Sequence, residues 1–251
     1  MKRTLTFFSA CLLLISLMSD MPGFIQPDSS SSILKGAWEK KDASGNITTL
    51  ICTEKYLMFA SYSISGKKYL KSGGGPYQLS SANGTEIMSF TRDFNTEDST
   101  KVGLTIANDY TLSGEKLVVP SGPLQGSWDK VKEPKGATVL TSAWRIISRE
   151  GADGKMVKMM KGSRKTIKIL SGSHFQWAAI DTDTKIFSGT GGGTYALKDG
   201  KYVETLDFFS KDNNRVGKNL SFSYTLNGKE WEHTGVSSTG SRVHEIWEKQ
   251  E

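Results

Sequence analysis

The stretch YLMFASYSISGKKYLKSGGGPYQLS, residues 56–80, aligns without a gap with HFQWAAIDTDTKIFSGTGGGTYALK, residues 174–198. In both stretches three consecutive glycines are followed by one variable residue and then by a tyrosine, Tyr77 in the first and Tyr195 in the second. A gapless match of this length indicates that the chain contains two copies of one unit.

Shorter matches extend this repeat in the same order along both copies. The matched pairs are Trp38 with Trp144, Glu86 with Glu204, Phe90 with Phe208, Val102 with Val216, Tyr110 with Tyr224 and Trp128 with Trp247. Their offsets drift by only a few residues, as small changes in loop length would cause. A unit of about 105 residues is too long for a solenoid repeat or a propeller blade, so each copy is expected to be a domain.

Each copy is patterned as a series of short strands. Runs rich in aromatic and β-branched residues favour strands, and they occupy 56–62, 86–90, 203–209 and 220–226. Hairpin dipeptides separate the runs, and they begin at Asn83, Ser113, Asp153, Asp199 and Asn227. Each copy has room for roughly eight strands, which favours a closed meander without exposed edges. The expected fold is all-β, with two tandem up-and-down antiparallel β-barrels preceded by a signal peptide.

The first twenty residues are typical of a secretory signal. Lys2 and Arg3 precede an apolar run over 5–17 that is shorter than the roughly 20 residues of a membrane helix, so no transmembrane span is expected in the mature chain. The apolar residues 12–15 follow Cys11, whereas lipidation needs the apolar run to come before the cysteine, which argues against a lipid anchor. The protein is therefore expected to be exported, either to the periplasm or outside the cell. The predicted boundaries are a signal peptide at 1–20, a flexible leader at 21–32, barrels at 33–132 and 141–251, and a linker at 133–140.

The composition excludes few functions. The formal charge of +6 includes Lys2 and Arg3, and the remainder is spread along the chain, so it is weak evidence for an anionic partner. Basic and aromatic residues do not gather on one strand pair, so no nucleic-acid partner is expected. The mature chain retains one cysteine, Cys52, so it cannot form an intrachain disulfide.

A tryptophan begins each copy, Trp38 after Gly36 and Trp144 after Ser142, and a glycine-rich hairpin lies in the middle. These features resemble the lipocalin-like (calycin) domains of secreted bacterial proteins, in particular a small, largely uncharacterised family built on GxW…GGGxY…E…W. The resemblance covers nearly all of residues 33–251, although Ser142 departs from the glycine of the motif. It implies barrels whose first-strand tryptophan plugs one end, and a cavity that holds an apolar ligand. It does not imply catalysis.

Two carboxylates are the most informative polar residues. Period-2 alternation puts Glu204 on one face with Leu206 and Phe208, and Glu86 on one face with Phe90. If these faces point inward, each barrel holds a buried carboxylate that needs a partner. Such a group either anchors a ligand or is a structural carboxylate bonded inside the barrel. One glutamate per barrel does not make an acid/base pair, and no Gly-x-Ser-x-Gly elbow occurs, so a non-enzymatic protein is expected.

The remaining candidates are aromatic residues and histidines of the two copies. Core packing is the default for each of them, because a barrel of about eight strands is either filled by side chains or holds one small ligand. Histidines 174, 233 and 244 lie in separate segments, so no metal or cofactor is expected. The candidate ligand-binding residues are Glu86, Glu204, Tyr77, Tyr195, Phe59, Trp177, His174 and Trp231, the last of which is specific to the second copy.

The triple glycines allow two interpretations. Phosphate-binding loops continue into a helix N-terminus, whereas here a strand follows. A bulge or corner at which the backbone packs against the plugging tryptophan fits better.

The sequence therefore favours an exported protein that binds a small, partly apolar molecule inside one or both barrels. The alternative is a structural or protein-interaction module with filled barrels that acts through its surface. The interior volume of the barrels distinguishes these two functions, because ligand sites have volumes of about 300 Å³ or more.

Overall fold

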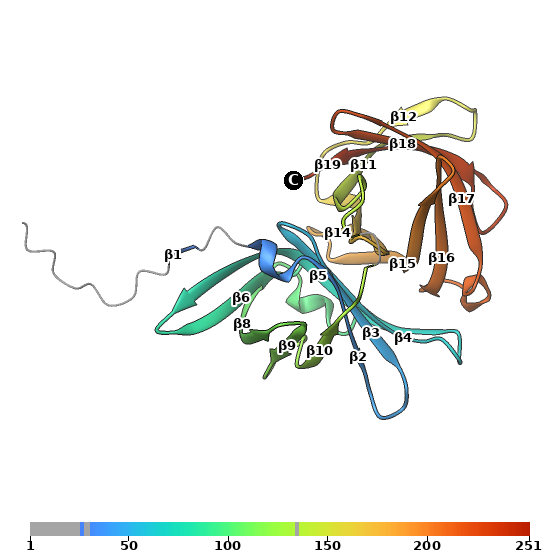
Figure 1. Cartoon of the computed structure of the whole chain (residues 1–251). Coiled ribbons are helices and arrows are strands. Elements are labelled where there is room, and N and C mark those ends of the chain that lie inside the picture. The colour runs from blue at the N-terminus through green and yellow to red at the C-terminus, as the bar shows by residue number, and fades with distance from the viewer. Residues whose placement is uncertain (1–25, 28–30, 134–135) are drawn as a thin grey trace, which may run out of the picture.

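The computed structural model describes residues 26–27, 31–133 and 136–251 (Figure 1). The predicted signal segment 1–20 lies outside these residues, as does most of the predicted leader 21–32. Within the described part of the chain, no helix is long and apolar enough to cross a membrane. The chain folds into two eight-stranded antiparallel barrels in tandem, so the predicted all-β fold is confirmed.

The first barrel is an up-and-down meander that closes between its first and last strands. Glu39 and Trp38 on the first strand pair with Asp129 and Lys130 on the last. Its strands are β2 Gly36–Lys41, β3 Ile47–Cys52, β4 Tyr56–Ser63, β5 Lys68–Ala82, β6 Thr85–Thr91, β8 Thr105–Ser113, β9 Lys116–Val119 and β10 Gly126–Lys130. Short additions are β1 Gln26–Pro27 and β7 Phe94–Asn95, both paired with β5, and the 3-10 helices η1 Ser31–Leu34 and η2 Ser99–Lys101.

The second barrel repeats this topology and closes in the same way, with Ile146 on its first strand paired to Trp247 on its last. Its strands are β11 Ser142–Glu150, β13 Arg164–Leu170, β14 His174–Asp181, β15 Ile186–Lys198, β16 Lys201–Phe209, β17 Asn219–Asn227, β18 Glu230–Val236 and β19 Arg242–Lys249. A short extra strand, β12 Met156–Lys158, pairs with the end of β11. The 3-10 helix η3 Asn213–Arg215 corresponds to η2.

Tryptophan indoles fix one end of each barrel. Trp38 Nε1 donates to the carbonyl oxygen of Leu34 at 2.8 Å, and Trp144 Nε1 donates to that of Leu140 at 2.8 Å. Both indoles are buried. The same hydrogen bond therefore occurs at equivalent positions in both copies, as the duplication predicted from sequence requires.

The glycine triplets lie inside β5 and β15, where the backbone must approach neighbouring strands closely. A side chain at Gly193 would collide with the carbonyl oxygen of Thr205, and the β15–β16 register shifts by one residue beside it. The predicted bulge is therefore confirmed in the second copy. The predicted packing partner, the plugging tryptophan, was wrong. The aromatic rings that contact the glycines come from the adjacent strand, where Phe59 contacts Gly73 and Trp177 contacts Gly191.

The strand registers correct the predicted match between Glu86 and Glu204. Tyr77 pairs with Phe90, 13 residues further along, whereas Tyr195 pairs with Glu204, nine residues further along. The β5–β6 hairpin is thus four residues longer than β15–β16. Because of that difference, Phe90 is the structural counterpart of Glu204, and Glu86 lies near the exposed tip of its hairpin.

The two barrels pack side by side through an apolar layer (Figure 1). Its buried residues are Ala37, Ile51, Met58 and Phe94 from the first barrel and Ala143, Ile167, Ile169, Ala178 and Ile180 from the second. Tyr62 also stacks on Phe208 with ring centroids 4.9 Å apart. The outer faces of both sheets are therefore apolar here, which a pattern of inward apolar and outward polar residues does not predict.

A candidate ligand site in the second barrel

A buried ion pair crosses the interior of the second barrel. Lys168 extends from β13 toward Glu204 on β16, with Nζ 2.6 Å from Oε1 and both side chains 5% exposed. Tyr202 Oη donates a second hydrogen bond to the same carboxylate oxygen at 2.8 Å. A buried charge requires such compensation, because desolvation costs several kcal/mol per ion.

Four aromatic rings surround the Lys168 ammonium. Its nitrogen lies 5.2 to 5.4 Å from their centroids, within the range of cation–π attraction; the rings belong to Phe175, Tyr202, Trp231 and Trp247. The rings and Glu204 together hold the ammonium in one position.

A second buried pair lies beside the first. His233 Nε2 is 2.9 Å from Glu245 Oε2, and Trp247 Nε1 donates to that oxygen at 3.2 Å. Burial lowers the pKa of His233. Burial alone would raise the pKa of Glu245, but the hydrogen bond from His233, together with the charge of Lys168, holds it below its usual value.

These protonation states leave His233 Nδ1 as an acceptor. The imidazole is neutral and donates from Nε2 to the ionised Glu245, so Nδ1 carries the lone pair. Nδ1 is buried and has no hydrogen-bond partner among the described residues.

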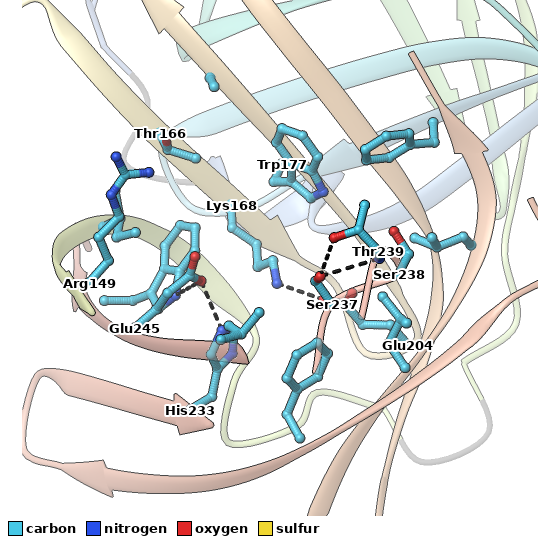
Figure 2. Close-up of a pocket in the computed structure, with 18 residues that line it drawn as sticks. Arg149, Thr166, Lys168, Trp177, Glu204, His233, Ser237, Ser238, Thr239 and Glu245 are labelled. Atoms are coloured by element: carbon cyan, nitrogen blue, oxygen red, sulfur yellow. Dashed lines mark hydrogen bonds and ion pairs between the residues drawn. The ribbon is translucent and has the colours of Figure 1, made fainter. Parts of the chain in front are cut away.

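A pocket of about 360 Å³ opens beside the two buried pairs (Figure 2). Lys168, Glu204, His233 and Glu245 line its polar side. Its apolar wall consists of Ile146, Trp177, Ala179, Leu206, Phe209, Leu220, Phe222, Val243 and Trp247. Arg149 and the β18–β19 loop, with Ser237, Ser238 and Thr239, are at the rim. The pocket thus joins an apolar chamber to a polar inner wall.

The bulge in β16 shapes this wall. Gly192 pairs with Phe208 and Gly193 with Leu206, so Asp207 is the extra residue. Side-chain alternation shifts by one at a bulge. Phe209 therefore lines the pocket, whereas Phe208 contacts the first barrel, contrary to the predicted common face of Glu204, Leu206 and Phe208.

The first barrel has apolar residues at the corresponding interior positions. Leu50 pairs with Trp38 as Lys168 pairs with Trp144, and Phe90 is the counterpart of Glu204. By the same comparison of registers, Leu117 replaces Trp231, Val119 replaces His233 and Gly126 replaces Glu245. Leu50, Phe90, Leu117 and Val119 belong to one buried apolar cluster.

The structure separates seven of the eight predicted site residues into three groups. Glu204 and Trp177 line the pocket, and Trp231 belongs to the rings around Lys168. Tyr77, Tyr195 and Phe59 are buried framework residues, because the two tyrosine hydroxyls bond the carbonyl oxygens of Thr53 and Ser171. Glu86 is exposed and lies outside both interiors, with Tyr110 Oη 3.4 Å from its Oε2.

His174 lies between the barrels and not inside one. Its Nδ1 is 2.8 Å from Ser173 Oγ, and its Nε2 is 3.7 Å from Glu39 Oε1 of the first barrel. Burial lowers the pKa of His174 to about 4. It is therefore neutral at physiological pH and part of the barrel–barrel contact.

Sequence reasoning did not single out Lys168, Tyr202, Glu245 or Trp247 as site residues, and it considered His233 only as a metal ligand. Period-2 alternation carries the missing signal. In β18 it places His233 on the face of buried Trp231, and in β19 it places Glu245 on the face of Trp247. A polar residue alternating with buried tryptophans indicates a polar barrel interior.

Among the described residues, no group of three or more histidine, cysteine, aspartate or glutamate side chains could hold a metal ion. Neither the known protein-family models nor the curated proteins give a match to this chain.

Proposed function

We propose that this protein binds one small, partly apolar molecule inside its second barrel, without catalysing a reaction. The observation that carries the proposal is the pocket of about 360 Å³, which joins apolar walls to the buried Lys168–Glu204 and His233–Glu245 pairs. This volume falls in the range of about 300–1,000 Å³ typical of ligand sites, which combine apolar walls with a few placed polar groups.

The wall chemistry defines the ligand class. Trp177, Phe209 and Leu220 favour a flat or aliphatic apolar body. Glu204 and His233 on the polar side of the pocket favour a ligand that carries a polar group at one end. Lys168 neutralises Glu204, and Glu245 accepts hydrogen bonds from His233 and Trp247, so the ligand need not bring a negative charge to the inner wall.

The first barrel serves as a structural partner in this proposal. Its interior is occupied by the apolar cluster around Leu50 and Phe90, and its outer face packs on the second barrel. This favours the filled-barrel alternative for that half of the chain alone.

Export is the remaining component of the proposed function, and it rests on Lys2, Arg3 and the apolar run at 5–17. The barrels then belong to a lipocalin-like protein of the periplasm or the extracellular space. Cell fractionation tests this: the full chain should leave the cytoplasm, and a chain that lacks residues 1–20 should stay there.

Binding is tested with N-phenyl-1-naphthylamine, an apolar fluorophore that carries an N–H donor. The full chain should bind one equivalent with a rise in fluorescence. Thr166→Trp should abolish the signal, because Thr166 lines the pocket. Thr48→Trp is the matched control, since Thr48 pairs with Ser61 in the first barrel as Thr166 pairs with Ala179. Binding that survives Thr166→Trp, or disappears only in Thr48→Trp, contradicts the proposal.

A further inference from the structure

The hairpin between β11 and β13 is the largest insertion that separates the two copies. Trp38 pairs with Leu50, 12 residues further along, whereas Trp144 pairs with Lys168, 24 residues further along. The additional residues include β12, which lies outside the barrel wall and pairs with the end of β11 (Figure 1). The second copy therefore has an element for which the first has no counterpart.

The composition of this insertion is cationic and apolar at once. Residues 155–165, KMVKMMKGSRK, carry five lysines and arginines and no acidic residue; we call this segment the cationic rim. Met156 is 38% exposed, Val157 49% and Met160 89%. Three apolar side chains are thus exposed within five residues, and exposed apolar patches mark interaction sites.

The cationic rim borders a smaller cavity that adjoins the pocket. This cavity, of about 140 Å³, is lined by Met159 and Met160 of the rim and by four cations, Arg145, Arg149, Arg164 and Lys165. This cavity and the main pocket share Ile146, Arg149, Thr166 and Ala179 as lining residues. The rim is thus connected to the pocket through these four shared residues.

Nearby acids neutralise only part of this charge. Lys155, Lys161 and Lys165 are within 4 Å of Asp153, Glu248 and Asp93 respectively. Residues 145–165 still hold seven lysines and arginines against two acids, whereas the corresponding residues 39–47 of the first copy hold two of each. The positive charge is therefore specific to the copy that has the pocket.

We propose that the cationic rim docks the second barrel on a membrane surface that contains anionic lipids. Lys155, Lys158, Lys161 and Arg164 would face lipid phosphates, an attraction that juxtamembrane basic residues are known to supply. Met156, Val157 and Met160 would enter the headgroup region, as the apolar residues of interfacial segments do. A nucleic acid would use the cations but would leave these three exposed side chains without a partner.

Docking brings the pocket close to the bilayer, where an amphiphilic molecule can pass between lipid and protein. This second step rests on the proposed function, whereas the docking itself does not. The two are separable by experiment, because Thr166 lines the pocket and residues 155–161 lie outside it.

The test uses the full chain and sedimented vesicles of phosphatidylcholine alone or mixed with phosphatidylglycerol. We expect binding to the mixed vesicles, weak binding to phosphatidylcholine alone, and loss of binding at high salt. Lys155→Gln/Lys158→Gln/Lys161→Gln should weaken the affinity for mixed vesicles by at least about tenfold. Met156→Ser/Val157→Ser/Met160→Ser should also weaken it, which pure charge attraction would not produce.

The β4–β5 hairpin of the first barrel provides a matched control. It carries Lys67, Lys68 and Lys71 beside the exposed Ile64 and Leu70. Lys67→Gln/Lys68→Gln/Lys71→Gln removes the same formal charge and should leave vesicle affinity within about twofold, since it does not touch the rim.

Three outcomes overturn the docking proposal: equal losses in the two lysine variants, unchanged affinity in the Met156→Ser/Val157→Ser/Met160→Ser variant, or tighter binding to duplex DNA than to mixed vesicles. Thr166→Trp should retain vesicle binding while losing the naphthylamine signal, and the rim variants should show the reverse. A failure of docking is thereby distinguished from a failure of the ligand site.

Discussion

The two barrels share a framework and differ in what the framework encloses. Trp38 and Trp144 make the same hydrogen bond at the same distance, yet the strand position beside them holds Leu50 in one barrel and Lys168 in the other. The closing tryptophans, the glycine corners and the strand order were kept in both copies, while the interior residues diverged. Barrel closure therefore does not require an apolar interior, provided that buried charges are paired.

The largest expected effect comes from giving the second barrel one interior residue of the first. Lys168→Leu leaves Glu204 buried without its ammonium and should cost about 3–5 kcal/mol of unfolding free energy. The double change Lys168→Leu/Glu204→Phe, which supplies both residues of the first barrel, should recover most of this loss because an apolar pair can replace a buried ion pair. Urea unfolding monitored by tryptophan fluorescence measures both. Additive losses in the double variant would contradict the assigned equivalence of Phe90 and Glu204.

Acid should destabilise the contact between the barrels through His174. Burial lowers its pKa to about 4, below the value of about 6.5 for an unfolded chain. The unfolded state therefore takes up the proton first, and stability present above pH 6.5 should fall by up to about 3 kcal/mol as the pH drops toward 4. His174→Gln should remove this part of the pH dependence, as unfolding at several pH values can measure. If the unfolding free energy of His174→Gln depends on pH as steeply as that of the unchanged protein, another group causes the acid sensitivity.

Replacing either of two equivalent aspartates at the barrel–barrel contact by asparagine should change the stability of the protein, in opposite directions for the two positions. Burial and the charge of Glu39 raise the pKa of Asp207 to about 6, so its contribution is present below about pH 4 and is lost as the pH rises through 6. Asp207→Asn should therefore stabilise the protein by about 1–2 kcal/mol at pH 7, since solvent screens part of the full shift.

Asp93 occupies the corresponding place in the first barrel and is well paired. Lys165 Nζ lies 2.7 Å from its Oδ2, and Tyr56 Oη donates to the same oxygen at 2.6 Å. Asp93→Asn should destabilise by about 1–2 kcal/mol at pH 7. The same sign for Asp93→Asn and Asp207→Asn in thermal unfolding would contradict this account of the contact.

The smallest effect on stability is expected from a substitution at Glu86, the residue that the sequence alignment matches with Glu204. Glu86→Gln changes an exposed side chain and should alter stability by less than about 0.5 kcal/mol. Glu204→Gln should cost several times more, because it removes the charge that compensates Lys168. Comparable losses of stability in the two variants would support the equivalence of Glu86 and Glu204 that the sequence alignment indicates.

Sequence reasoning reached the fold because its signals are local and repeated. Turn dipeptides, strand runs and the glycine–tyrosine match determine two barrels without any knowledge of packing. The same reasoning paired Glu86 with Glu204 because Glu86 precedes Phe90 by the spacing that separates Glu204 from Phe208. Only the strand registers show that one hairpin is four residues longer.

The site was harder to predict because it depends on the position of side chains across the barrel. Glu204 and Trp177 were found, whereas Lys168 was missed because its partner is three strands away. Pocket volume depends on how side chains of different size fill the space, and His174 depends on packing between domains. Neither follows from alternation along one strand.

Native mass spectrometry of the full chain, purified from cells that naturally produce it, shows whether the second barrel holds a ligand. We expect one small molecule per chain, retained by Glu86→Gln and lost from Lys168→Leu/Glu204→Phe. A bound molecule that the double variant keeps, or one that Glu86→Gln releases, would place the ligand outside the second barrel and contradict the account.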